Sequence, residues 1–201
     1  MLTGIEICRR INLGDIVIDP FDESAVNPNS VNLRLGPKLL VYRAAHFEVP
    51  RQLSPLAPQL QDGTELPCLD MAKDNPTDEL VIGPKGLVLI PGVLYLGSTL
   101  EWTETRNLIP RLDGRSSIGR LGMTIHITAA YGDIGYCGRW TCEIAVMHPL
   151  RVYAGAQICQ ISYATVIGEI REYTGKYQGA KDAMSSRLYM DNQEAPKREG
   201  S

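Results

Sequence analysis

The sequence predicts a mostly β protein in which many short strands form one sandwich-like or barrel-like domain. Short runs of apolar and β-branched residues recur along the chain, and Gly, Pro or polar residues separate them. This is the pattern of half-buried strands joined by turns. The length of 201 residues suits a single core, and a composition of 44% hydrophobic and 21% charged residues is ordinary for a globular chain. Together these observations favour a β-sandwich or β-barrel.

A short helix is predicted at the start of the chain. Thr3 and Glu6 have the spacing of a capping box, and Ile5, Cys8 and Ile11 follow at helical spacing. After this helix the apolar period shortens to that of strands. We expect strands within residues 16–18, 31–35, 39–42, 80–90, 93–102, 107–110, 122–128, 140–146, 150–153 and 157–163.

Two stretches do not fit the strand pattern. Residues 50–79 carry five prolines among scattered polar residues, and we interpret them as a long surface excursion or extended edge of the same domain. The polar end of the chain, residues 191–201, is predicted to be a disordered tail. Residues 1–190 are therefore expected to form a single domain.

Charge and cysteine usage limit the possible partners and compartments. A net charge of -3 and a pI of about 5.6 argue against binding to a nucleic acid polymer, although a local basic pocket for a small anion is compatible with them. The five cysteines form no paired framework, which favours reduced thiols. Neither a secretion signal nor a membrane-spanning apolar run is recognised. A cytoplasmic protein without a membrane segment is expected.

The segment GRSSIGR contains groups that suit an anion. Gly114 allows the backbone to approach a ligand closely, while Arg115, Ser116 and Ser117 offer guanidinium, hydroxyl and backbone donors for phosphate oxygens. The alternative interpretation is a polar β-turn with an exposed arginine. These four residues alone do not decide between the two.

A carboxylate, Glu143, and a cationic side chain, Arg120, lie further along the same region. Glu143 lies in TCEIAV, where Cys142 and Ile144 flank it, so the strand pattern places a carboxylate on a core-like strand. Such a carboxylate is costly unless it is paired. One interpretation is a structural ion pair with Arg120, and the other is a general acid/base whose pKa is tuned by burial and an adjacent cation.

The chain resembles the deoxycytidine triphosphate deaminases, which belong with the trimeric dUTPases. The resemblance covers most of the chain, and the spacing from GRSS to the glutamate agrees with the family pattern without a gap. The resemblance implies a dUTPase-like distorted β-barrel or jelly roll with few helices, and a homotrimer with active sites between subunits. It rests on NPNSVNLRLG, IPGVLYLGSTLEW, GRSSIGRLGMTIHITAAYGDIGYCG, CEIAV, QICQISY and GKYQGAKDAMSSRLY.

The resemblance also implies roles for individual residues. Glu143 would move protons during attack of water on C4 of cytosine, and Ser116, Arg120 and the backbone carbonyl of Ala129 would hold that water. Asp133 would bind the sugar hydroxyl. Residues about 173–190 would form a lid, and Mg²⁺ would accompany the phosphates. The expected nucleotide-binding residues are Arg115, Ser116, Ser117, Arg120, Asp133, Thr141, Cys142, Glu143, Gln160, Tyr173 and Lys176.

A zinc mechanism is the alternative route to deamination. Zinc deaminases need H-x-E followed by P-C-x-x-C, whose ligands hold the metal that activates water. His46 and Glu48 fit the first half, and Pro67 with Cys68 begins the second. Met71 stands where the second cysteine is required, so we expect no zinc site.

Three positions depart from the family pattern. Ile134 replaces a proline after the aspartate, Asn32 replaces an aspartate in the SVNLRLG segment, and Ala180 replaces a glutamine of the lid. Loss of that lid amide would remove hydrogen bonds to the nucleotide. The departures weaken the case for a triphosphate substrate more than the case for deamination.

The leading hypothesis is metal-independent hydrolysis of dCTP to dUTP and ammonia, in the supply of deoxyuridine nucleotides for dTTP synthesis. One alternative is a bifunctional enzyme that forms dUMP, or a plain dUTPase. A related deaminase acting on dCMP is another. A nucleotide-binding regulator that has lost turnover is the alternative from a different class of protein.

Overall fold

Strands dominate the structure, a computed structural model that describes residues 1–43 and 68–193, and the mostly β prediction is confirmed. No helix within these residues has the length and apolarity needed to cross a membrane. The helical elements are α1 (Gly4–Asn12), the 3-10 turn η1 (Glu23–Ala25), α2 (Ser116–Gly119) and α3 (Tyr189–Gln193). The strands are β1 (Ile16–Asp19), β2 (Val26–Asn27), β3 (Ser30–Tyr42), β4 (Thr77–Val81), β5 (Leu87–Leu89), β6 (Tyr95–Thr99), β7 (Trp102–Thr105), β8 (Leu108–Gly114), β9 (Met123–Thr124), β10 (Cys137–Gly138), β11 (Thr141–Val146), β12 (Leu150–Val152) and β13 (Gln157–Thr165).

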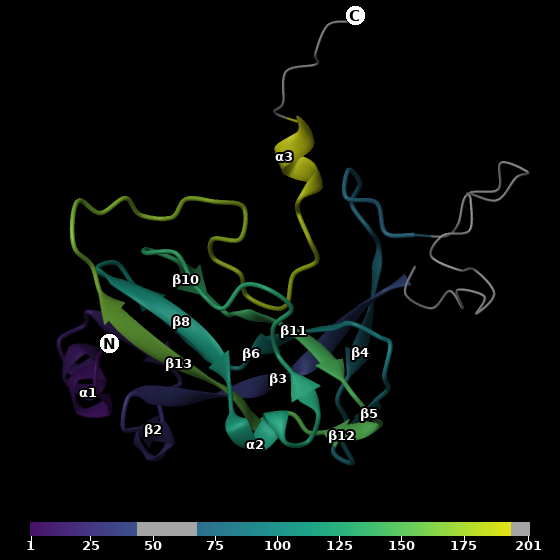
Figure 1. Ribbon diagram of the computed structural model, residues 1–201, viewed down its shortest axis with the longest axis horizontal. Coiled ribbons are helices and arrows are strands. Elements are labelled where there is room, and N and C mark those ends of the chain that lie inside the picture. Colours follow the sequence, from purple (N-terminus) through teal and green to yellow (C-terminus); the bar gives the residue numbers. More distant parts are fainter. Residues whose placement is uncertain (44–67, 194–201) are drawn as a thin grey trace, which may run out of the picture.

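The predicted barrel-like arrangement is also confirmed. The largest sheet runs in the order β8-β13-β3-β6-β11-β9, with β2 and β4 also paired to β3. A smaller sheet runs β1-β7-β10, and β12 pairs with β5. The strands wrap around one hydrophobic core as a distorted, nearly closed barrel (Figure 1).

The N-terminal helix forms as its sequence predicts. Thr3 is the N-cap, and its Oγ1 accepts a hydrogen bond from the Glu6 backbone N–H at 3.3 Å, which satisfies one unpaired donor of the first turn. The Glu6 carboxylate accepts hydrogen bonds from the side chains of Arg9 and Arg10. Ile7 is fully buried, so the apolar side of the helix covers the barrel.

Strand β3 is the central strand and unites two predicted strands. Leu33, Leu35 and Leu39 are fully buried in it, and it pairs with β13 on one side and β6 on the other. The pairing with β6 changes register between Leu35 and Leu39. Pro37 lies in this interval and has no N–H for the ladder, which explains why the sequence pattern looks interrupted there.

The predicted strand over residues 122–128 is largely wrong, because only Met123–Thr124 is a strand. One backbone bond to β11 follows, from the Glu143 N–H to the Ile125 carbonyl at 2.9 Å, and side-chain bonds then take the place of the ladder. The Thr124 hydroxyl donates to the His126 carbonyl at 2.8 Å, and the Ile127 N–H donates to Glu143 Oε2 at 2.7 Å. This segment is consequently a loop beside β11.

The C-terminal segment crosses the barrel next to β10. The Arg139 N–H donates to the Ala180 carbonyl, and the Gly179 N–H donates to the Cys137 carbonyl, each at 2.8 Å. Figure 1 shows the segment passing over this end of the barrel before α3. Helix α3 extends to Gln193, so it includes the first residues of the predicted disordered tail, while residues 194–201 and 50–67 lie outside the described part.

Candidate active site

Glu143 lies in the wall of a cavity of about 550 Å³. On β11, Cys142 and Ile144 are fully buried, whereas Glu143 between them is half-buried on the opposite side of the strand. The side chain therefore faces the cavity and not the core. We call this the Glu143 cavity, and its lining includes Leu96, Ala129, Asp133, Tyr136, Trp140, Thr141, Glu143, Tyr173, Tyr177, Met184 and Ser186.

A peptide group, and not an arginine, holds the Glu143 carboxylate within the single chain. Its Oε2 accepts the Ile127 N–H at 2.7 Å, which gives one carboxylate oxygen a fixed partner. In residues 1–43 and 68–193 no ion pair joins Glu143 to Arg120. Arg120 instead is exposed at the C-cap of α2.

Four other predicted site residues line the same cavity, namely Ala129, Asp133, Thr141 and Tyr173. The Tyr173 N–H donates to the Ile134 carbonyl at 2.7 Å, which ties the start of the predicted lid to the Asp133 loop. The Thr141 hydroxyl oxygen accepts the Met184 N–H at 3.1 Å. Residues of the predicted lid thus line the Glu143 cavity of their own chain.

Aromatic side chains form one wall of this cavity, and of its three rings only Tyr173 was among the residues that the resemblance implies. The ring centroids of Tyr136 and Trp140 lie 4.9 Å apart, and those of Tyr136 and Tyr173 lie 6.0 Å apart. Burial raises the pKa of Tyr136, and its hydroxyl donates to the Arg139 carbonyl at 2.7 Å. A planar, partly apolar ligand such as a base suits such a wall. Tyr136 and Trp140, four positions apart in the sequence, were a signal that could have indicated this wall.

A second cavity, of about 590 Å³, holds the predicted phosphate residues Arg115, Ser116 and Gln160. We call it the Arg115 cavity. An Arg115 guanidinium N–H donates to the Gln157 carbonyl at 2.9 Å, which fixes the charged group at the start of β13. The guanidinium, the serine hydroxyl and the Gln160 amide make this cavity suited to an anion.

The remaining predicted residues lie outside both cavities. Ser117 and Arg120 are exposed on α2, and the Cys142 side chain is buried in the core. Lys176 forms an ion pair with Asp191 of α3, so the predicted phosphate ligand has a partner in its own chain. Figure 1 places α2 and the C-terminal segment at opposite ends of the barrel. The two cavities nevertheless adjoin, because Ile125 and His126 line the Arg115 cavity and the next residues, Ile127 and Thr128, line the Glu143 cavity.

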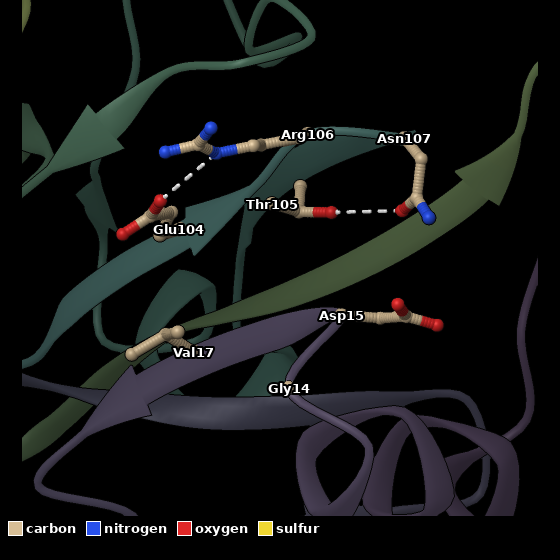
Figure 2. A pocket seen from close by; sticks show the side chains of 7 residues that line it. All are labelled: Gly14, Asp15, Val17, Glu104, Thr105, Arg106 and Asn107. Carbon is tan, nitrogen blue, oxygen red and sulfur yellow. Dashed lines mark hydrogen bonds and ion pairs between the residues drawn. The ribbon is translucent and has the colours of Figure 1, made fainter.

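A third, smaller cavity of about 140 Å³ contains none of the predicted residues. It lies between the start of β1 and the turn that joins β7 to β8 (Figure 2). Its charged groups are paired: Arg106 Nε lies 3.4 Å from Glu104 Oε1, and Asp15 binds Arg10 at 2.8 Å. This cavity offers no unpaired catalytic group and is not a candidate active site.

The zinc-type residues can be placed only in part. His46, Glu48 and Pro67 lie outside the described residues, and Cys68 and Met71 are exposed. Among the residues that are described, no group of three or more His, Cys, Asp or Glu side chains is arranged to hold a metal ion.

Comparison with known proteins decides the family. A family profile described as "dCTP deaminase-like" matches residues 1–166. The chain belongs to this dCTP deaminase-like family. It is 54% identical over 192 residues to a protein of Leptospira biflexa named "dCTP deaminase, dUMP-forming", with 95% of this chain and 97% of the relative covered. A protein of Cytophaga hutchinsonii with the same name is 47% identical over 192 residues, covering 95% of this chain and 98% of that one.

A solved structure supports the dCTP deaminase-like fold independently. The crystal structure of 2'-deoxycytidine 5'-triphosphate deaminase from Agrobacterium tumefaciens aligns with a TM-score of 0.58 at 22% identity. The alignment covers 82% of this chain and 47% of that protein. At this identity the likeness concerns the fold.

Proposed function

We propose that this protein hydrolyses deoxycytidine 5'-triphosphate and releases dUMP, ammonia and pyrophosphate. The observation that carries the proposal is the Glu143 carboxylate, which lies in a cavity with an aromatic wall. Oε2 is held by a peptide N–H, while Oε1 has no hydrogen-bond partner among the described residues, so it is available for proton transfer. The names of the relatives favour dUMP over dUTP as the product.

Two water molecules balance the reaction. In the first step, water loses a proton to Glu143 as its oxygen bonds to C4 of cytosine, and Glu143 passes that proton to N3. Glu143 then moves the proton of the new C4 hydroxyl to the amino nitrogen, the C4–N bond breaks, and ammonia leaves a uracil ring. In the second step, a second water attacks the α-phosphorus, the bond to the β-phosphate oxygen breaks, and pyrophosphate leaves. Glu143 ends each cycle ionised.

The other residues of the site have supporting roles in this proposal. Arg120, Ser116 and the Ala129 carbonyl hold the attacking water, and Asp133 binds the sugar hydroxyl. The hydrogen-bond donors of the Arg115 cavity suit the phosphate chain. Lys176 joins these ligands only after it leaves Asp191. The residues assigned to nucleotide binding are Arg115, Ser117, Thr141, Cys142 through its backbone, Gln160, Tyr173 and Lys176.

We further propose that the working enzyme is a homotrimer whose active sites form between subunits. The support is the placement of the predicted site residues in two adjoining cavities of one chain, with Arg120 in neither of them. An exposed Arg120 meeting Glu143 of a neighbouring chain would complete each site. An interface of this kind buries charges that a single chain leaves in water.

Magnesium is proposed as part of the substrate and not as a resident metal. The described residues bring no three acidic, His or Cys ligands together. Mg²⁺ is commonly bound through substrate phosphates with few protein ligands. When bound there it neutralises phosphate charge, while Glu143 carries the protons of deamination.

We also propose that the protein works in the cytoplasm. All five cysteines are free in the structure, and Cys142 and Cys159 are fully buried. Free thiols are typical of reducing compartments.

The test is to incubate the purified protein separately with dCTP, dUTP and dCMP, each with Mg²⁺, and to measure ammonia and separate the nucleotides. We expect ammonia and dUMP in equal amounts from dCTP. Accumulation of dUTP would contradict the dUMP-forming step, and ammonia from dCMP alone would contradict the triphosphate substrate. Tight nucleotide binding without ammonia would identify a regulator.

A further inference from the structure

A chain of hydrogen bonds runs behind the Arg115 cavity and ends at Gln160. Asn27 Nδ2 donates to Ser30 Oγ at 3.2 Å, and Ser30 Oγ donates to Gln160 Oε1 at 2.8 Å. Gln160 Nε2 donates to the Gly114 carbonyl at 3.3 Å. Ser30 is only 3% exposed, so its hydroxyl donates within this series of hydrogen bonds and not to solvent. Of the four residues, Gly114 and Gln160 line the cavity.

The backbone carbonyl of Gly114 sets the direction of every bond in this chain. A carbonyl can only accept, so the Gln160 amide must turn its nitrogen toward Gly114 and its oxygen toward Ser30. Ser30 must then donate its one proton to Gln160 and accept from Asn27. Reversal of the Gln160 amide would place two acceptors together at Gly114, which costs a hydrogen bond.

A second branch holds Asn27 in the same orientation. Its other Nδ2 hydrogen goes to Asn32 Oδ1 at 2.9 Å, and Asn32 Nδ2 donates to Gln157 Oε1 at 3.1 Å. Asn27 therefore donates both amide hydrogens to fixed acceptors. Asn32, one of the departures from the family pattern, has a structural use here that depends on its amide.

We infer that Ser30 is a positioning residue that keeps the N–H side of Gln160, and not its carbonyl oxygen, directed along the Arg115 cavity. The second Gln160 N–H is then available to an anion beside Arg115 and Ser116. The opposite orientation would present a carbonyl oxygen and repel an anion. In identifying that anion as the phosphate chain of a deoxycytidine nucleotide, the inference rests on the proposed function.

The test is a double-mutant cycle between Ser30→Ala and Gln160→Ala. Binding is measured by calorimetry with dCTP in a Glu143→Gln background, where turnover is blocked, and with inorganic tripolyphosphate in the otherwise native protein. Ser30→Ala should weaken both ligands about fivefold, the size expected for one hydrogen bond. It should have no further effect once Gln160 is alanine. Ser30→Thr, which keeps the hydroxyl, should restore binding.

Two controls separate positioning from general damage. Ser162→Ala removes a different buried serine, which lies in β13, and should leave both affinities unchanged. Deoxycytidine, which has no phosphate, should bind the Ser30→Ala variant as tightly as it binds the native protein. If Ser30→Ala does not fold, Gln160→Glu provides the second test: a carboxylate facing the anion should weaken tripolyphosphate more than Gln160→Ala does.

Equal losses for Ser30→Ala with and without Gln160, or equal losses for deoxycytidine and dCTP, would overturn the inference. So would tripolyphosphate binding by Gln160→Glu that matches Gln160→Ala. Failure of the proposed function looks different: the native protein would release no ammonia from dCTP. The tripolyphosphate measurements would still decide the role of Ser30 in that case.

Discussion

At the scale of single residues, the position of Glu143 follows from simple strand alternation. Its neighbours Cys142 and Ile144 fill the core, so Glu143 must face away from it. From the sequence, the free-energy cost of burying the Glu143 carboxylate was one reason to expect an ion pair with Arg120. The structure avoids that cost differently, because the carboxylate is half-buried and accepts a peptide N–H from Ile127.

Glu143→Gln should abolish deamination while dCTP binding stays within about twofold of the native protein. The amide keeps the shape of the side chain and cannot accept a proton. Ammonia release and calorimetric binding, measured on the same preparation, check this prediction. Ammonia release at the native rate would show that another group moves the proton.

At the scale of elements, an ion pair with a buried carboxylate joins β3 to the turn between β6 and β7. Glu101 is 3% exposed and accepts from the Arg34 backbone N–H at 2.8 Å and from Arg34 Nε at 2.6 Å. Removal of one partner leaves the other as a buried charge or donor without its partner. Lys38 and Glu79 form an exposed pair nearby, between β3 and β4, with N and O 3.0 Å apart.

Glu101→Ala should lower the free energy of unfolding by about 3 kcal/mol, near the lower end for a broken buried pair. Glu79→Ala, the matched control in the exposed pair, should change it by less than about 0.5 kcal/mol. Urea denaturation at a fixed protein concentration measures both. Equal effects of the two substitutions would contradict the assigned importance of burial.

Local pattern predicted much of this architecture, and its failures have physical causes. The Thr3 cap fixed the start of α1, and alternation located β11 and β13 correctly. The pattern missed the continuity of β3 because Pro37 interrupts the ladder without ending the strand. It also missed the Arg34–Glu101 pair, since partners 67 positions apart leave no periodic signal.

At the scale of the whole molecule, the division of the site residues between two cavities is the central feature. Of the residues that the sequence proposed for the site, Glu143 lines one cavity and Arg115 lines the other. Within the described part of one chain no ion pair joins Arg120 to Glu143, and no sequence motif reports that separation. Assembly of several copies is the simplest way to unite them.

The native mass should therefore be near three times the 22.2 kDa of one chain.

Mixing two inactive variants tests the shared site most directly. Arg120→Ala and Glu143→Gln would be produced together in equal amounts with different tags, so that mixed trimers form and can be purified. If Arg120 and Glu143 of neighbouring chains build each site, about a third of the sites in the purified mixed trimers would combine two native residues, because one of the three neighbouring pairs in each ring does so. We predict ammonia release from dCTP at about a third of the native rate per trimer. A mixture no more active than the two variants measured separately would contradict a site shared between subunits.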